Sequence, residues 1–370
     1  TAFVVPAGTG AREVEAFVSP IGTEALEEKV TRLREAIARG AARATVDDVA
    51  SELHSALVAP WAKHLQAADR LLISPAGPLR VLPFAALKDD GGHYLIEHLP
   101  LHTVDSATLY ARLIDRRDDF DAAHARVVAF GDPVYDAGSP ATAPVSTPIV
   151  ALRQRGYTLE PLPGTRREVA VLDSLFAPSV EVHVGPSATE ERVKALGSDV
   201  DILHFACHAV ADREIPSASA LVLTQPGPDQ AADENGLLQA WEILEDVRLD
   251  AELVTLSACQ TAIGKELGPE GMAGLTRAFQ YAGARSIVAS LWDVPDEPTA
   301  SLMRDFYANL ARGLPKDESL RRAQLASLRG ASNGADGAAR ALGGLTPSDR
   351  DVPRAPGFAW AAMQLVGDWH

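Results

Sequence analysis

The chain has 370 residues, of which 46% are hydrophobic and 23% are charged, a globular composition that excludes a disordered or fibrous protein. Its 34 basic and 50 acidic residues give a formal net charge of -16, so it lacks the basic field that binding to nucleic acid or an anionic membrane requires. No stretch approaches the roughly 18 apolar residues of a membrane span, and no export signal is visible. Two cysteines are too few for a disulfide scaffold and form no Cys-x-x-Cys pattern, so we expect a reducing, cytoplasmic setting.

The first 120 residues mix short strands with helices. Apolar residues at helical spacing predict helices at 25–39 and 46–57, and Ser106 is placed to cap a helix that runs to Ile114. Short strands are predicted at 3–5, 15–18, 70–74 and 99–104. We expect residues 1–120 to form a smaller α/β region that packs on the rest of the chain.

Residues 121–370 alternate strictly between strands and helices, which predicts a mostly parallel sheet covered on both faces. Strands are predicted at 126–130, 180–184, 201–206, 220–223, 252–257, 286–290 and 360–366. Helices are predicted at 165–176, 189–196, 239–245, 269–282, 296–310 and 317–328, and the first of these opens with Thr165 and Glu168 in a capping-box pattern. Mobile loops are expected near 132–160 and 330–356.

Two chemically special residues, His208 and Cys259, follow two of these predicted strands. Sites in parallel sheets form at the carboxyl ends of strands, and adjacent strands lie ~4.8 Å apart. A cysteine beside an imidazole is suited to acyl transfer, because the histidine favours the thiolate and later gives a proton to the leaving amine. On spacing alone, a small core cysteine and a hydrogen-bonded histidine remain an open alternative.

The segments around these residues, HFACHA at 204–209 and LVTLSACQTA at 253–262, resemble the CHAT family. Members of this family are caspase-like cysteine peptidases, often attached to tetratricopeptide repeats. Further matching stretches lie at 75–84, 131–133, 162–168, 268–271, 282–286, 290–294 and 365–369. The resemblance extends from about residue 50 to the end and implies a caspase-like three-layer fold with a mostly parallel central sheet.

The resemblance also implies roles for single residues. Cys259 would be the nucleophile and His208 its partner, and the backbone N–H groups of Cys259 and Ala209 would form the oxyanion hole. The family usually has glycine at position 209, and alanine does not readily adopt a positive φ, so a left-handed backbone there would perturb the hole. Cys207 is expected to alternate to the opposite face of its strand from His208.

Substrate selection is expected from acidic residues near the strand ends. The resemblance implies that Asp132 pairs with the P1 side chain, and that Trp292, Asp293 and Asp296 form a P1/P2 wall. A carboxylate in a partly desolvated slot binds Arg or Lys, so a basic P1 residue is predicted. The alternative is that these aspartates are loop and cap residues, with Asp296 as a helix N-cap.

No metal or cofactor site is predicted. His204 and His208 lie on one face of a strand but about 13 Å apart, too far to share an ion, so His204 is interpreted as a hydrogen-bonded structural residue. The glycines at 264, 268 and 271 are followed by no Gly-Lys-Ser/Thr, which is needed for a phosphate loop.

Three functions are compatible with these patterns. The first is a cysteine endopeptidase that cleaves a protein partner through a thioester acyl-enzyme, regulated by an upstream repeat or sensor region. The second, suggested by Ala209, is a catalytically silent caspase-like scaffold or signalling module. The third is a flavodoxin-like ligand-binding domain, which the missing phosphate loop disfavours. The intact pair of His208 and Cys259 favours the peptidase.

Overall fold

The computed structural model describes residues 1–5, 14–115, 120–135, 152–154, 157, 159–212, 215–226, 234–260, 269–292, 294, 296–330 and 359–370. The expected loop at 330–356 lies outside these residues except for Gly330, as does much of the loop expected at 132–160.

Strands and helices alternate along the chain as the sequence predicts. The strands are β1 (Ala2–Val4), β2 (Glu15–Phe17), β3 (Leu71–Ile73), β4 (Leu101–Thr103), β5 (Val127–Pro133), β6 (Val180–Gly185), β7 (Ile202–Val210), β8 (Ala220–Val222), β9 (Leu237–Gln239), β10 (Leu253–Gln260), β11 (Ser286–Ser290) and β12 (Met363–Gly367). The helices are α1 (Thr23–Ala38), α2 (Arg43–Leu57), α3 (Leu95–His98), α4 (Ala107–Asp115), α6 (Pro163–Phe176), α7 (Glu190–Lys194), α8 (Ala240–Asp246), α9 (Pro269–Ala282), α10 (Asp296–Leu310) and α11 (Lys316–Leu328). Six short 3₁₀ helices join them among the described residues.

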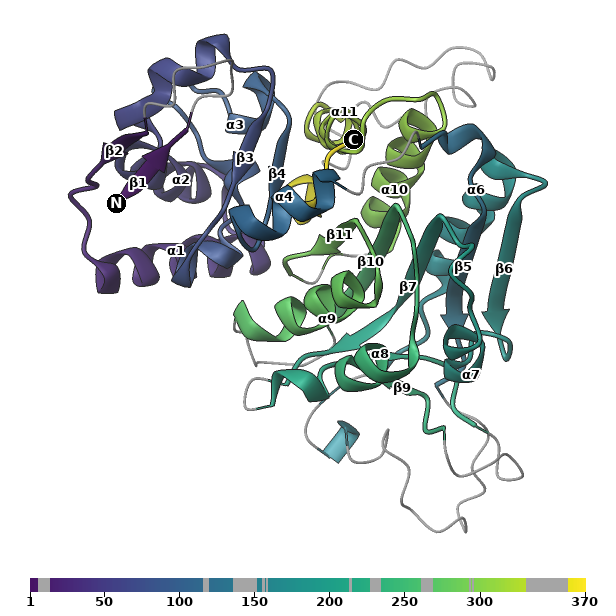
Figure 1. Ribbon diagram of the computed structural model, residues 1–370. Coiled ribbons are helices and arrows are strands. Elements are labelled where there is room, and N and C mark those ends of the chain that lie inside the picture. Colours follow the sequence, from purple (N-terminus) through teal and green to yellow (C-terminus); the bar gives the residue numbers. More distant parts are fainter. Residues whose placement is uncertain are drawn as a thin grey trace, which may run out of the picture.

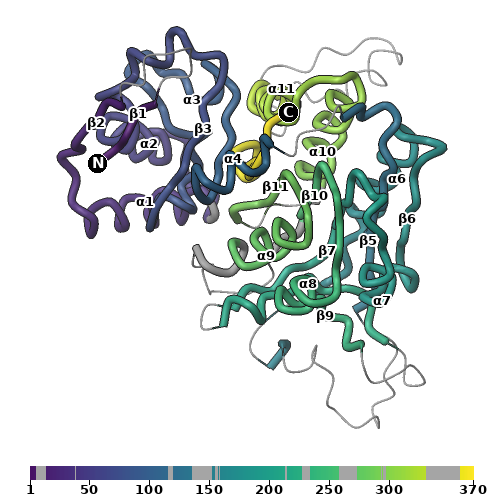
Figure 2. The backbone as a smooth tube through the Cα atoms, viewed as in Figure 1, coloured from purple at the N-terminus to yellow at the C-terminus, as the bar shows by residue number. Residues whose placement is uncertain are grey.

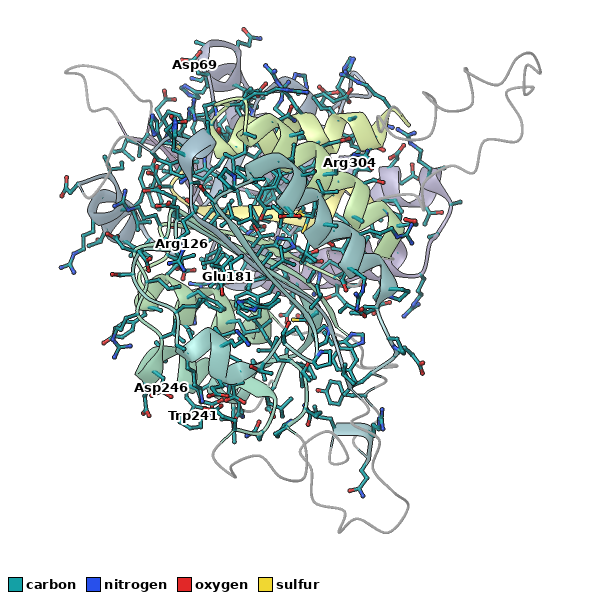
Figure 3. All side chains as sticks on the ribbon, turned by 90° about the vertical axis from the view of Figure 1, so that its right-hand side faces the viewer. Asp69, Arg126, Glu181, Trp241, Asp246 and Arg304 are labelled. Carbon is teal, nitrogen blue, oxygen red and sulfur yellow. The ribbon has the colours of Figure 1, made fainter. Side chains whose placement is uncertain are left out.

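One large sheet organises the chain, with strand order β3-β4-β12-β11-β10-β7-β5-β6 and with β8 and β9 attached to the end of β7. Most neighbours are parallel, whereas β12 is antiparallel to β11 and β8 is antiparallel to β7. Arg126, just before β5, lies 3.4 Å from Glu181 of β6 (Figure 3). The mixed α/β class with a large, mostly parallel central sheet is confirmed.

Helices cover both faces of this sheet, giving three layers (Figure 1). Alternate positions of β7 separate the two cores: Leu203 and Phe205 pack toward α8 and α9, and Ile202 and Ala206 pack toward α6 and α10. This follows from the alternation of side chains along a strand, and it explains why β7 is apolar throughout. None of the helices within the described residues is long and apolar enough to cross a membrane.

The first hundred residues contribute directly to the sheet. Strands β3 and β4 extend it, because β4 pairs with β12 and β12 pairs with β11. In Figure 2 the blue segment that carries α4 lies beside the yellow C-terminal segment. One hydrophobic cluster joins Leu33 of α1 and Leu53 of α2 to Trp292 and Trp360 from the C-terminal half. The division at residue 120 therefore stays a prediction about folding units, since the two parts share a sheet and a core.

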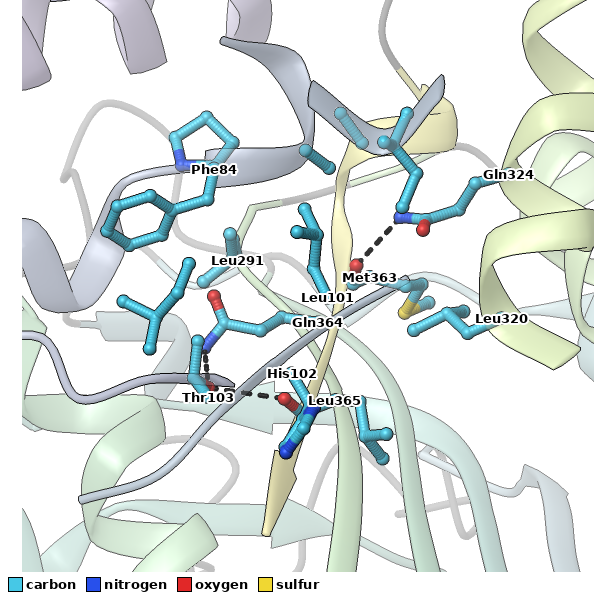
Figure 4. Close-up of a pocket in the computed structure, with 15 residues that line it drawn as sticks. Phe84, Leu101, His102, Thr103, Leu291, Leu320, Gln324, Met363, Gln364 and Leu365 are labelled. Atoms are coloured by element: carbon cyan, nitrogen blue, oxygen red, sulfur yellow. Dashed lines mark hydrogen bonds between the residues drawn. The ribbon is translucent and has the colours of Figure 1, made fainter. Parts of the chain in front are cut away.

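Hydrogen bonds join β12 to β4 on one side and to α11 on the other (Figure 4). Thr103 of β4 donates to the Leu365 carbonyl at 3.2 Å and accepts from the Gln364 amide at 2.8 Å. Gln324 of α11 donates to the Met363 carbonyl at 3.0 Å. The cavity between them has a volume of about 30 Å³, room for about one water molecule, so it is a packing gap and not a ligand pocket.

An ion pair joins Arg70, just before β3, to the buried Asp317 of α11. The Arg70 guanidinium, which also lies over the Trp369 ring, is 2.9 Å from the carboxylate of Asp317, and His102 is 3.9 Å from it. Asp317 is only 1% exposed. Burial raises its pKa to about 6 from 3.8, although Arg70 opposes the shift.

This raised pKa predicts how stability depends on pH. Between about pH 4 and pH 6 the folded protein holds a proton on Asp317 that the unfolded chain has lost, so the contribution of this group to stability decreases as pH rises through that range. A pKa shift of this size changes the free energy of unfolding by about 3 kcal/mol. We therefore expect the free energy of unfolding of the wild type to fall, relative to Asp317→Asn, by up to about 3 kcal/mol between pH 4 and pH 7. Urea unfolding at several pH values measures this difference. If the free energy of unfolding changes with pH equally in the two proteins, the raised pKa of Asp317 is contradicted.

Candidate active site

His208 and Cys259 lie side by side on neighbouring strands. β7 and β10 are parallel, and their register pairs the Cα atoms of the two residues. Both strands are longer than predicted, reaching Val210 and Gln260, so the two residues lie just inside the strand ends and not beyond them. The predicted end of β7 is wrong because β8 takes over the edge that β5 leaves, and it pairs with β7 from His208 onward.

The imidazole of His208 is buried and held on two sides. Its Nε2 lies 2.7 Å from the carbonyl oxygen of Glu160. A carbonyl only accepts, so Nε2 carries a proton and Nδ1 is the basic nitrogen of the neutral ring. The ring also packs against Tyr135, with centroids 4.8 Å apart, and the Tyr135 hydroxyl accepts a hydrogen bond from the His208 backbone N–H at 3.2 Å.

The start of α6 supports this site, and it differs from the predicted capping box. α6 begins at Pro163 and has no side-chain cap. Thr165 instead donates to the Leu162 carbonyl at 2.6 Å and accepts from the Asp132 N–H at 2.9 Å. Glu168 contacts His204 on the face of β7 that α6 covers, with 3.1 Å between the carboxylate and Nε2. The box is wrong because the helix begins before Thr165, whose hydroxyl bonds the Leu162 carbonyl and the Asp132 N–H, and because Glu168 pairs with His204.

His204 belongs to a buried polar chain beneath the site. Its Nδ1 lies 2.9 Å from the Tyr307 hydroxyl, which donates to Thr255 of β10 at 2.7 Å. Because Tyr307 gives its proton to Thr255, its oxygen accepts a hydrogen bond from Nδ1 of His204. The interpretation of His204 as a hydrogen-bonded structural residue is confirmed. Burial raises the pKa of Tyr307, so the hydroxyl keeps its proton.

The two neighbours of His208 lie where strand alternation predicts. Cys207 is fully buried in the opposite core, among residues such as Leu221 and Phe279, and burial raises the pKa of its thiol. Ala209 is in extended backbone, and of the non-glycine residues that the structure describes only Asp132 has a positive φ. The left-handed conformation considered for position 209 is therefore not adopted.

The predicted substrate-binding residues have different surroundings. The Asp132 carboxylate is paired with Arg166 of α6, whose Nε and Nη2 lie 2.8 Å from it, and its side chain is 22% exposed. Trp292 is 8% exposed and packs in the cluster that contains Leu33 and Leu53, so little of the ring is available to a substrate. Asp293 lies outside the described residues, and Asp296 is the first residue of α10.

Three carboxylates of Glu190, Glu234 and Glu242 lie within 4.8 Å of one another, an arrangement that could hold a cation. The Lys194 ammonium already lies at their centre, 2.8 Å from Glu190 and Glu242 and 3.1 Å from Glu234. Asp246, labelled in Figure 3, is 3.8 Å from the same ammonium. Burial and the neighbouring Glu234 raise the pKa of Glu190 to about 8. This cluster is an ion-pair network that supplies its own cation.

Sequence reasoning misses three residues: Tyr135 and Glu160, which contact His208, and Arg166, which pairs with Asp132. The first two are in or beside the Pro- and Ser-rich stretch that the sequence predicts as a loop, where no periodicity marks a residue as buried. Glu160 also acts through its carbonyl, which no side-chain pattern reveals. Arg166 lies in the 162–168 motif, so that motif is the available signal.

Comparison with known proteins gives one extended match and several distant ones. A family model described as "CHAT domain" matches residues 47–368. Tetratricopeptide repeat protein 28 of Mus musculus is 27% identical over 328 residues, which cover 78% of this chain and 12% of that protein, so the chain spans a small part of that relative. The Saccharomyces cerevisiae separase–securin complex has a TM-score of 0.47 at 13% identity, covering 88% of this chain and 18% of that one. The Arg-specific cysteine proteinase gingipain R has a TM-score of 0.46 at 8% identity, and the match covers 94% of this chain and 76% of that one.

Proposed function

The chain belongs to the CHAT domain family, and we propose that it is a cysteine peptidase in which Cys259 is the nucleophile and His208 is its acid–base partner. One observation carries this proposal: the register of β7 and β10 pairs these two positions on adjacent strands. The hydrogen bond from Nε2 to the Glu160 carbonyl supports it further, because it leaves Nδ1 to exchange a proton with the thiol.

The proposed reaction proceeds in two steps. The thiol of Cys259 passes its proton to His208, and the thiolate attacks the carbonyl carbon of the scissile peptide bond. The tetrahedral intermediate collapses to a thioester as His208 protonates the leaving amine. A water molecule, deprotonated by His208, then attacks the thioester, which releases the acid product and returns the proton to the enzyme.

The oxyanion of the intermediate would be bound by the N–H groups of Cys259 and Ala209. Cys259 belongs to the register pair His208–Cys259, and Ala209 belongs to the next pair, Ala209–Gln260. Extended backbone at Ala209 is accessible to any residue, so glycine is not required there for conformational reasons. This supports activity despite the departure from the family pattern.

The two cysteines should differ strongly in reactivity. A thiol paired with an imidazole has a lowered pKa, so alkylation of Cys259 by iodoacetamide should reach its plateau rate at neutral pH. Cys207 is buried and its pKa is raised, and its alkylation should be at least about a hundredfold slower because it requires opening of the core. Peptide mass spectrometry from pH 5 to pH 9 measures both rates. His208→Ala should abolish the fast alkylation of Cys259. If Cys207 is alkylated faster than Cys259, the assignment of Cys259 as the nucleophile is contradicted.

We propose that Asp132 selects a basic P1 residue, with Asp293, Asp296 and Trp292 as further substrate contacts. The carboxylate of Asp132 pairs with one guanidinium, that of Arg166, whose Nε and Nη2 both contact Oδ2, so its chemistry suits a basic side chain. Because this carboxylate is partly exposed and shared with Arg166, Asp132→Asn should lower kcat/KM for a P1 Arg peptide about tenfold. A P1-randomised peptide library tests the preference.

Asp121→Asn, an equal change of charge on an exposed carboxylate, is the control and should leave cleavage unchanged. The iodoacetamide rate at Cys259 should be the same in both variants, since neither touches the thiol. A library preference for Leu, Met or Asp at P1 would overturn the assignment of Asp132.

The substrate is proposed to be a protein partner, and a repeat region elsewhere in the whole protein is proposed to bring it to the site, as the name of the mouse relative suggests. The alternative is a silent scaffold that keeps the fold without turnover. A proteome-wide search for new termini, comparing wild type with Cys259→Ala, separates the two. New termini that depend on Cys259 identify a peptidase, and their absence in cells containing the partner favours the scaffold.

A further inference from the structure

We propose that Tyr135 is a positioning residue for His208, holding its backbone through the phenol oxygen and favouring its protonated ring through the aromatic face. This inference rests on the proposed peptidase function, in which His208 must accept and return a proton. It concerns a residue that acts through the histidine.

The first support is the change of pairing partner along β7 beside His208. On one side of β7, pairing with β5 ends at Ala206, and pairing with β8 begins at His208. The Tyr135 hydroxyl lies at this change of partner and accepts the His208 N–H at 3.2 Å. A buried N–H that loses its acceptor destabilises the backbone around it, so this bond fixes the strand where the imidazole is attached.

The second support is the contact between the two rings. Their centroids are 4.8 Å apart and the planes are inclined by 41°, and Tyr135 is only 5% exposed. The face of an aromatic ring attracts a cation within about 6 Å, more strongly when both are shielded from water. Tyr135 therefore stabilises the imidazolium that forms when His208 takes the proton of Cys259.

The third support is the packing that fixes Tyr135 itself. It belongs to a small apolar cluster with Leu152, Tyr157, Leu159 and Val210. The residue after Leu159 is Glu160, whose carbonyl accepts from Nε2 of the same imidazole. One packed unit therefore holds both the Glu160 carbonyl at Nε2 and the Tyr135 ring against the imidazole.

The other ionisable groups around His208 are few among the described residues. Cys259 is its register partner on β10. His204, which pairs with Glu168 of α6, lies on the same face of β7 as His208, about 13 Å away along the strand. The side chain of Glu160 is exposed. None of these groups is altered by a substitution at Tyr135, so a difference in the titration of His208 between Tyr135→Phe and Tyr135→Leu reports the ring contact.

Two substitutions separate the two contacts. Tyr135→Phe keeps the ring and removes the acceptor, so kcat for a peptide substrate should fall about fivefold to tenfold with KM unchanged. Tyr135→Leu removes both, so the alkaline limb of the pH profile should also move about half a unit lower. Tyr157→Phe is the matched control: Tyr157 lies in the same cluster, but its hydroxyl donates to the Ala211 carbonyl at 3.3 Å and not to His208. It should change neither quantity.

Titration of His208 by NMR in the Cys259→Ala background gives a readout that needs no activity. The pKa of His208 should be about half a unit lower in Tyr135→Leu than in the background protein, with no change in Tyr157→Phe. Equal titrations in Tyr135→Leu and its background, or equal kinetic losses in Tyr135→Phe and Tyr157→Phe, overturn the proposal. If cleavage does not depend on Cys259, the peptidase function fails instead, and the NMR titration still decides the role of Tyr135.

Discussion

Cys259→Ala and His208→Ala should each abolish cleavage of a verified substrate while the protein stays folded. Without the thiol no acyl-enzyme can form, and without the imidazole the thiol stays protonated and the amine leaves unprotonated. Residues that act as one unit lose nearly everything when either is removed, so we expect at least a ~1,000-fold loss in kcat for each, and little further loss in the double variant. Initial rates with the purified variants measure it.

Cys207→Ala is the matched control, since it removes the other cysteine from the adjacent position of β7. That side chain fills the opposite core, so the variant should lose some stability but keep the nucleophile. Cleavage by Cys259→Ala at a rate close to that of wild type would exclude the proposed mechanism, provided that circular dichroism shows both proteins folded.

Gly283→Ala should destabilise the protein strongly, although it adds only one methyl group. Gly283 follows α9 with a φ of +125°, and an added Cβ would lie 1.8 Å from the carbonyl oxygen of Leu249. That backbone cannot move away freely, because the Leu249 N–H donates to the Ala282 carbonyl at 2.7 Å. Strained φ and a backbone clash together should lower the free energy of unfolding by more than about 3 kcal/mol.

Gly313→Ala provides the control for this effect. Its φ of +80° imposes a similar conformational strain, but nothing lies within 4 Å of the added Cβ. We expect a loss of about 1–2 kcal/mol from the φ angle alone. Denaturant midpoints compare the two variants, and equal losses would show that the close approach at Leu249 is relieved by movement of the chain.

The regular elements are predictable because their patterns are local. The helices at 269–282 and 296–310 have the predicted bounds, since each combines helical periodicity with a clear start signal. Strand ends are less predictable. β7 continues to Val210 because β8 pairs with it, and pairing with another segment leaves no mark in the sequence of β7 itself.

The site is predictable as far as its side chains have distinctive chemistry. Residue type and strand placement single out His208 and Cys259, and the register pairs them. The partner of Asp132 escapes prediction, because Arg166 is 34 residues away and its pairing depends on how α6 packs on β5. Trp292 is predicted to form a substrate wall, whereas residues from the first hundred cover most of it. Contacts between distant segments are what the pattern of one sequence cannot supply.

The position of β12 has a consequence for biosynthesis. This strand lies between β4 and β11, so it joins strands that the ribosome has made some 260 and 75 residues earlier. Until residues 363–367 have left the ribosome, β4 and β11 have no partner at the positions that β12 fills, and their open edges are exposed to non-native pairing. The sheet that carries His208 and Cys259 can therefore become continuous only after residues 363–367 have been synthesised.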